Sequence, residues 1–108
     1  MARIPTRFFG PLLVSNSPTT RYTVAAAEKI VIRHVHISNP SASAVTFTLS
    51  IGSDAAATRL YDAFSMPANS VLDAFWYETV DAAEIIQTNA GTNNILNITV
   101  NGDRIVLG

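Results

Sequence analysis

The sequence predicts an all-β protein, an antiparallel β-sandwich of about eight short strands with a jelly-roll-like arrangement. Three observations support this prediction. Apolar and polar residues alternate with a period of two, turn-forming residues recur at intervals of roughly 8–12 residues, and no segment has convincing helical spacing of apolar residues. Jelly-roll, immunoglobulin-like and barrel topologies all produce this alternation, so the strand order stays open at this level.

The composition indicates one domain with a packed core and a partly covered surface. The chain has 108 residues, enough for a single domain, and 48% of them are hydrophobic. Only 14% are charged, compared with about 25% in an average soluble domain. A lone monomer needs polar surface, so this shortage of charge favours a protein that is partly covered by partners.

Charge and cysteine content exclude several classes of function. Seven basic and eight acidic residues give a net charge of −1, which predicts neither nucleic-acid binding nor membrane binding. The absence of cysteine excludes disulfides, a cysteine nucleophile and a thiolate zinc site, and favours synthesis in a reducing compartment. No apolar run has the form of a signal peptide or a membrane span, so we expect neither export through a signal peptide nor a membrane-spanning segment.

The first twenty residues predict an extended N-terminal arm, and residues 21–108 predict the β-sandwich domain. Prolines and a glycine interrupt residues 1–20 and disfavour helices and central strands. Four apolar side chains in this segment could dock either on the chain's own domain or on a neighbouring subunit. These side chains are Phe8, Phe9, Leu12 and Leu13.

The remaining strands are predicted from alternation and are bounded by turn residues. In the segment 29–39, Val35 and Ile37 face one side, whereas His34 and His36 face the other. The segment 45–51 has the clearest alternation, typical of a strand that is buried on one side. Further strands are predicted at 58–66, 71–77, 84–88 and 95–101, and a tight hairpin at Asn101-Gly102 leads into a last strand at 104–107.

His34 and His36 form a pattern that could bind a metal. Side chains at positions i and i+2 of a strand point the same way, so both imidazoles could reach one ion. A metal site needs three or four donors, and the cupin spacing places a glutamate soon after the pair, where this chain has Pro40 and Ser41. We therefore expect no metal and no other cofactor, and interpret both histidines as outward-facing residues at a subunit contact.

No catalytic motif is present, so we predict that the protein is not an enzyme. The densest aromatic group is Phe75-Trp76-Tyr77. Successive strand residues alternate faces, so Phe75 and Tyr77 share one face and Trp76 takes the other. Unless both faces are covered, at least one ring points away from the core, which suits a protein interface or sugar stacking. We favour an interface and count Trp76 among the candidate interaction residues.

Several motifs resemble those of small virion proteins of tailed bacteriophages. The segment RYTVAAAEKIVIRHVHISNPSASAVTFTLSIG is similar to their opening strands, and MPANSVLD, VDAAEIIQ and ILNITVNG resemble their later elements. Together these motifs cover most of the chain after residue 20. The chain departs from the pattern at residues 25–27, where three alanines replace the usual Pro-Ala-Gly turn.

The resemblance implies a β-sandwich structural protein of the virion that carries no catalytic residues. A minor tail protein is favoured, and a head decoration protein or a receptor- or glycan-binding module at the tail tip are the alternatives. Other virion proteins are the implied partners, and a symmetric homo-oligomer is implied, for which we favour a trimer. The resemblance also implies synthesis in the cytoplasm of a bacterial host, followed by incorporation into the virion. In the glycan alternative, the ligand would be a glycan of the host surface.

Overall fold

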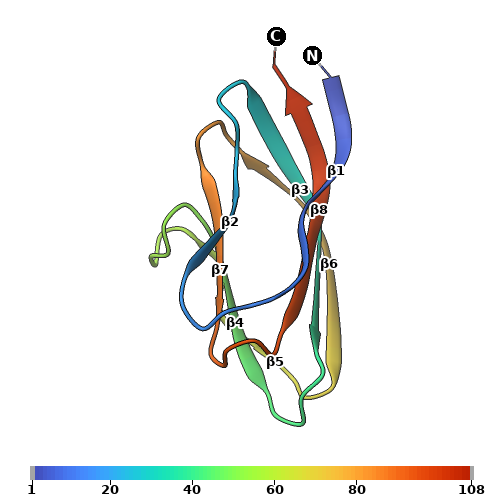
Figure 1. Ribbon diagram of the computed structural model, residues 1–108, viewed down its shortest axis with the longest axis vertical. Helices are drawn as coiled ribbons and strands as arrows, with labels where there is room; N and C mark the ends of the chain where they lie inside the picture. Colours follow the sequence, from blue (N-terminus) through green and yellow to red (C-terminus); the bar gives the residue numbers. More distant parts are fainter. Residues whose placement is uncertain (1, 108) are drawn as a thin grey trace.

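The computed structural model describes residues 2–107, which form eight β-strands and no helix (Figure 1). Within this range there is accordingly no helix that is long and apolar enough to cross a membrane. The strands are β1 (Ala2–Leu13), β2 (Thr19–Thr23), β3 (Glu28–Asn39), β4 (Val45–Ile51), β5 (Arg59–Met66), β6 (Ser70–Val80), β7 (Ile85–Ala90) and β8 (Asn97–Val106).

The strands form two four-stranded antiparallel sheets that pack face to face in an elongated sandwich of 48 × 25 × 19 Å. Sheet A has the order β1-β8-β3-β6, and sheet B has the order β2-β7-β4-β5. The pairs β1·β8, β2·β7, β3·β6 and β4·β5 are all antiparallel, so the chain runs as one long hairpin that is rolled into two sheets. This is the jelly-roll arrangement, and the predicted antiparallel sandwich of about eight strands is confirmed.

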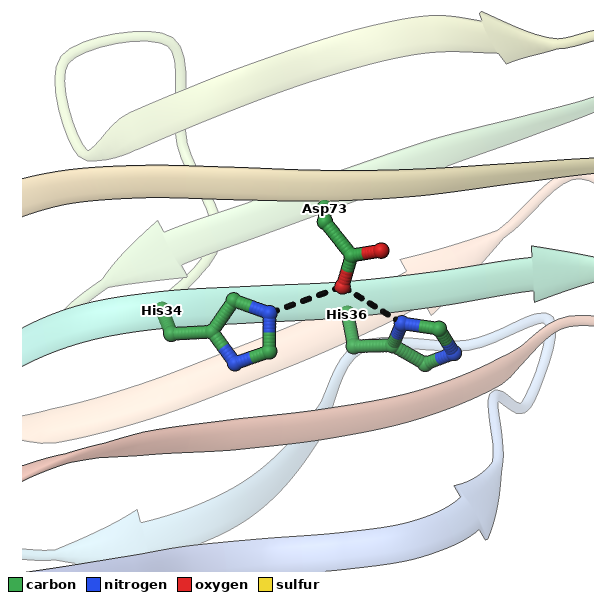
Figure 2. A group of neighbouring side chains, drawn as sticks. All are labelled: His34, His36 and Asp73. Atoms are coloured by element: carbon green, nitrogen blue, oxygen red, sulfur yellow. Dashed lines mark hydrogen bonds and ion pairs between the residues drawn. The ribbon is translucent and has the colours of Figure 1, made fainter.

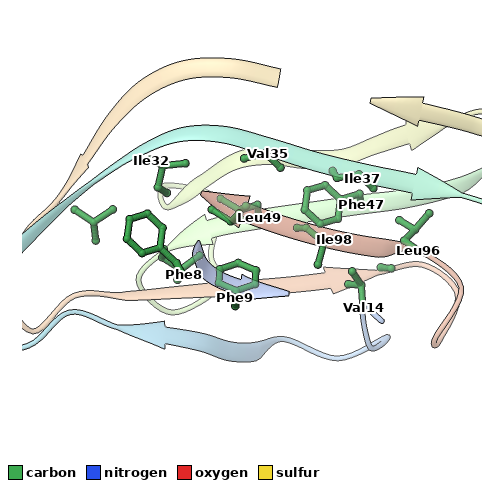
Figure 3. Packing of buried hydrophobic residues seen from close by; sticks show 14 of the residues in the cluster. Phe8, Phe9, Val14, Ile32, Val35, Ile37, Phe47, Leu49, Leu96 and Ile98 are labelled. Atoms are coloured by element: carbon green, nitrogen blue, oxygen red, sulfur yellow. The ribbon is translucent and has the colours of Figure 1, made fainter. Parts of the chain in front are cut away.

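The core lies between the sheets and is built from the alternating apolar residues of both inner faces (Figure 3). In β4, Val45, Phe47 and Leu49 are buried, whereas Thr46 and Thr48 lie on the other face. The other large, fully buried side chains include Ile30, Ile32, Ile37, Met66, Ile86, Leu96 and Ile98. Because the chain's own side chains fill the inner faces, contacts with other molecules must use the outer faces or the sheet edges.

The structure corrects the prediction of an N-terminal arm. Residues 2–13 form β1, which pairs with β8 along almost its whole length, and the two strands lie side by side in Figure 1. Phe8 and Phe9 are buried in the chain's own core, with 8% and 7% of their surface exposed. The N-terminal segment is therefore part of sheet A, and no boundary at residue 20 separates an arm from a domain.

The position of β1 explains why its prolines are compatible with a strand. β1 is an edge strand of sheet A and has β8 as its single neighbour, so Pro5 and Pro11 need not donate to a second ladder. The register against β8 shifts between Arg7 and Phe9 and again between Phe9 and Leu12. Such bulges break the strict alternation, which allows two consecutive phenylalanines to be buried.

The predicted hairpin at Asn101-Gly102 is also wrong, because β8 runs without a turn from Asn97 to Val106. Gly102 lies in the middle of sheet A, opposite Thr6 of β1 and Ile32 of β3. A Cβ atom at this position would overlap the carbonyl oxygen of Val31. The glycine is therefore required by the close approach of β8 to β3 and not by a turn.

Candidate functional site

The outer face of sheet A carries the most unusual group of polar and aromatic side chains in the described part of the chain. Val35 and Ile37 of β3 point into the core, which turns His34 and His36 outward. Between Ile32 and His34, the register of β3 shifts against both neighbouring strands. The alternation of inward and outward side chains is interrupted at this bulge, so it is out of phase before and after the bulge.

His34, His36 and Asp73 form a compact cluster on this face (Figure 2). Asp73 of β6 is the direct register partner of His36, and His34 lies two residues before His36 in β3. Asp73 Oδ1 is 2.8 Å from His34 Nε2 and 2.7 Å from His36 Nδ1. Figure 2 shows both rings converging on this one carboxylate oxygen. The sequence pattern predicted that the two histidines share a face, but it gave no indication of Asp73, which lies 37 residues after His36.

Two further contacts hold the His34 ring in place. The ring stacks on Phe75 with centroids 4.6 Å apart and an angle of 18° between the planes. The Asn101 amide nitrogen lies 3.2 Å from His34 Nδ1. If Asn101 donates to Nδ1, the proton of the neutral ring is on Nε2 and is donated to Asp73. The cluster is thus supported by β3, β6 and β8 together.

Hydrogen bonding from the two imidazoles favours the ionised form of Asp73. The hydrogen bond from His36, followed by that from His34, holds the pKa of the Asp73 carboxyl below its usual range. A carboxylate that accepts two imidazole donors is therefore ionised at neutral pH. Among residues 2–107, hydrogen bonds connect this cluster to Asn101 and to no serine or threonine hydroxyl.

Next to the cluster, Phe75 and Tyr77 form an exposed aromatic strip on the outer face of β6. Phe75 is 77% exposed and Tyr77 is 61% exposed, so two of the three rings in this segment face away from the core. Trp76 points to the other side, where it packs edge-on against Tyr61 with centroids 6.4 Å apart. The aromatic surface of this segment is therefore formed by Phe75 and Tyr77, and Trp76 does not belong to it.

An open depression of about 660 Å³ lies between the aromatic strip and β8. Arg33 crosses it, with its guanidinium 5.7 Å from the centre of the Tyr77 ring and 3.1 Å from Asp103 Oδ2. Asp103 also forms an ion pair with Arg3 of β1 at 3.2 Å. The depression thus combines aromatic rings with a fixed group of charged side chains.

The residues selected from the sequence lie in different places. Phe8 and Phe9 are in the core, Leu12 packs against the core, and Leu13 is 48% exposed at the end of β1. These four side chains therefore do not form one exposed docking surface, whereas His34 and His36 belong to the cluster with Asp73. Sequence reasoning missed Asp73, Asn101 and Arg33, because their proximity depends on strand register.

No family model matches the chain, and no match was found among curated proteins or solved structures. What the chain does is therefore inferred from the outer face of sheet A and from the sequence motifs.

Proposed function

We propose that this chain is a structural protein of a tailed-phage virion, of the minor tail type, and that it assembles through the outer face of β6. The observation that carries the proposal is the pair of large aromatic rings, Phe75 and Tyr77, exposed on an edge strand of a jelly-roll sandwich. Val71 of the same strand face is also 62% exposed, which extends the apolar surface.

The exposed rings provide a driving force for association. Covering Phe75 and Tyr77 would remove roughly 250 Å² of apolar surface from water, a gross gain of about 6 kcal/mol before the costs of association. β6 is also an edge of sheet A, and the unpaired backbone groups of an edge strand can accept another strand. The low proportion of charged residues, 14%, fits a surface that a partner covers.

The assignment to a virion is supported by the sequence motifs that resemble phage virion proteins. By analogy of fold, the jelly roll adds support, because it is a recurrent fold of viral capsid domains.

The direct test is mass spectrometry of purified particles of the phage that encodes the chain. Detection at a fixed number of copies per particle supports the proposal, and absence from particles that contain the other structural proteins overturns it. Immunogold labelling of the same particles separates a tail protein from the alternative of a head decoration protein.

The proposed interface is tested separately by light scattering after size exclusion. A double substitution, Phe75→Ser with Tyr77→Ser, should reduce a trimer or larger ring to monomers, because it removes the aromatic strip without changing the core. Leu13→Ser is the matched control, since it removes an exposed apolar side chain from the opposite edge strand of sheet A. Dissociation of the control, with the double variant intact, would move the interface to β1.

The depression next to the aromatic strip favours a second candidate, a glycan-binding module at the tail tip. Aromatic rings beside fixed polar groups are the combination that sugar binding requires, and Tyr77, Arg33 and Asp103 provide it. Binding on a glycan array that Tyr77→Ala abolishes and Leu13→Ser leaves intact would support this candidate. Binding that survives Tyr77→Ala would remove it.

A further inference from the structure

We propose that His34, His36 and Asp73 bind a divalent first-row transition-metal ion, for which Zn²⁺ is the reference. The inference is independent of the proposed virion role, because it rests on the donor atoms of one cluster. It also revises the sequence-based expectation of no metal, which was made when no third donor could be identified.

The donor atoms are arranged for one ion. One ring nitrogen each of His34 and His36 and a carboxylate oxygen of Asp73 lie within 4.8 Å of one another. Around a tetrahedral zinc ion with bonds of about 2.0–2.1 Å, neighbouring donors are about 3.3 Å apart. The nitrogen-to-oxygen distances of 2.7 and 2.8 Å are within about half an ångström of that separation. The separation of the two ring nitrogens is at most 4.8 Å, so side-chain rotations that change the donor separations by no more than about 1.5 Å would place all three donors around one ion.

The surroundings of the cluster position these donors before an ion arrives. The donors project from two hydrogen-bonded strands, and stacking on Phe75 fixes the plane of the His34 ring. When Nε2 binds a metal, the ring proton moves to Nδ1, and Asn101 can accept it by presenting its amide oxygen. Asn101 thus provides the outer-sphere hydrogen bond that metal-binding histidines usually have.

The chemistry of the donors selects the kind of ion. Two imidazole nitrogens and one carboxylate suit zinc, nickel, copper or cobalt better than magnesium or calcium, which prefer oxygen donors. The side chains are 25%, 36% and 44% exposed, so solvent can reach the ion and occupy its remaining positions. Arg33, the nearest basic residue on β3, is paired with Asp103, which offsets its repulsion of a cation.

The chain's composition makes the experiment simple to interpret. It contains two histidines and no cysteine, so every imidazole in the molecule belongs to this cluster and no thiolate competes. The full-length protein is freed of metal with a chelator, dialysed and titrated with Zn²⁺ in a calorimeter. Titration with Co²⁺, followed by visible absorption, reports the coordination directly. We expect one ion per chain.

Three variants and one control test the assignment. His34→Ala, His36→Ala and Asp73→Asn should each weaken Zn²⁺ binding by at least about tenfold, because each removes one donor. Asp81→Asn removes the same charge from an exposed carboxylate beyond the end of β6, where it pairs with Lys29, and should bind like the unmodified protein. Far-UV circular dichroism verifies that every variant is folded.

The results that would overturn the proposal are equally specific. Absence of stoichiometric Zn²⁺ binding to the unmodified, folded protein would refute it. Equal affinity in Asp73→Asn and the unmodified protein would also refute it, because the histidine pair alone would then be the site. In the proton NMR spectrum, the imidazole signals of His34 and His36 must shift together as Zn²⁺ is added; a shift of one ring alone contradicts a shared ion.

Discussion

Substitution of Gly102 by alanine tests the packing of the central strands of sheet A. Gly102 lies in β8, between β1 and β3, where the sequence suggested a hairpin turn. An alanine Cβ would overlap the Val31 carbonyl oxygen, and it would lie 2.9 Å from the Val31 carbonyl carbon and 3.0 Å from Phe8 Cε2. Comfortable contacts between carbon atoms are about 3.5–4.0 Å, so β8 and β3 must separate locally by roughly 1 Å.

The free-energy cost follows from this displacement. A backbone hydrogen bond of about 2.9 Å that is lengthened by roughly 1 Å is no longer within hydrogen-bonding range, and each lost bond costs about 1 kcal/mol. Overpacking of a filled interior costs a further 1–3 kcal/mol, typically about 2. Alanine also reduces the conformational entropy of the unfolded chain, which offsets about 0.4–1 kcal/mol of this destabilisation. With one lost hydrogen bond, we therefore expect Gly102→Ala to lower the free energy of unfolding by about 2 kcal/mol, a large part of the stability of a domain of this size.

The assay is urea unfolding followed by the fluorescence of Trp76, the one tryptophan in the chain. With a typical urea dependence of about 2 kcal/mol per molar, the unfolding midpoint should fall by about 1 M. Gly91→Ala is the matched control, because its new Cβ would meet the hydroxyl of Thr46, which can rotate away. Equal midpoints for Gly102→Ala and Gly91→Ala would refute the close approach of β8 to β3.

Three further predictions concern the core, a turn and the polar cluster. Phe9→Ala should cost about 3–5 kcal/mol in urea unfolding, because Phe9 is a core residue; a free arm would predict almost no change. Asn39→Ala should cost about 2 kcal/mol in thermal unfolding, since the two N–H groups of the buried Asn39 amide are shared among three backbone carbonyls around the 39–43 and 66–67 turns; an unchanged melting temperature would contradict this role. The lowered pKa of Asp73 means that its ionised form stabilises the fold above the ordinary aspartate pKa, and that this contribution is lost as the pH falls through the lower folded-state pKa. Between about pH 5 and about pH 2, Asp73→Asn should therefore lose less stability in urea unfolding than the unmodified protein, and parallel losses would be inconsistent with the hydrogen bonds to His36 and His34.

The fold class could be predicted from local patterns. Alternation with a period of two identified the inner face of β4, and its bounds agree with those in the structure. It also placed His34 and His36 on the same outer face and separated Trp76 from Phe75 and Tyr77. These features depend on the direction of successive side chains along one strand, which the sequence determines directly.

Local patterns failed where the environment of a residue came from another strand. Pro5 and Pro11 suggested an arm, but an edge strand with one neighbour accepts proline. Asn101-Gly102 suggested a turn, although Gly102 is needed because the Val31 carbonyl is too close for a side chain. In both cases the residue has two physical explanations, and the choice depends on which strands lie beside it.

In the candidate metal site, some features were determined by the sequence and others only by the tertiary structure. The sequence determined that the two histidines of β3 share a face, and its composition left them as the only imidazoles in the molecule. Only the tertiary structure decided that Asp73 is opposite His36, that Phe75 stacks on His34 and that Asn101 reaches it from β8. Strand register depends on long-range hydrogen bonds and on the complete core, and a shift of one residue would turn Asp73 to the opposite face.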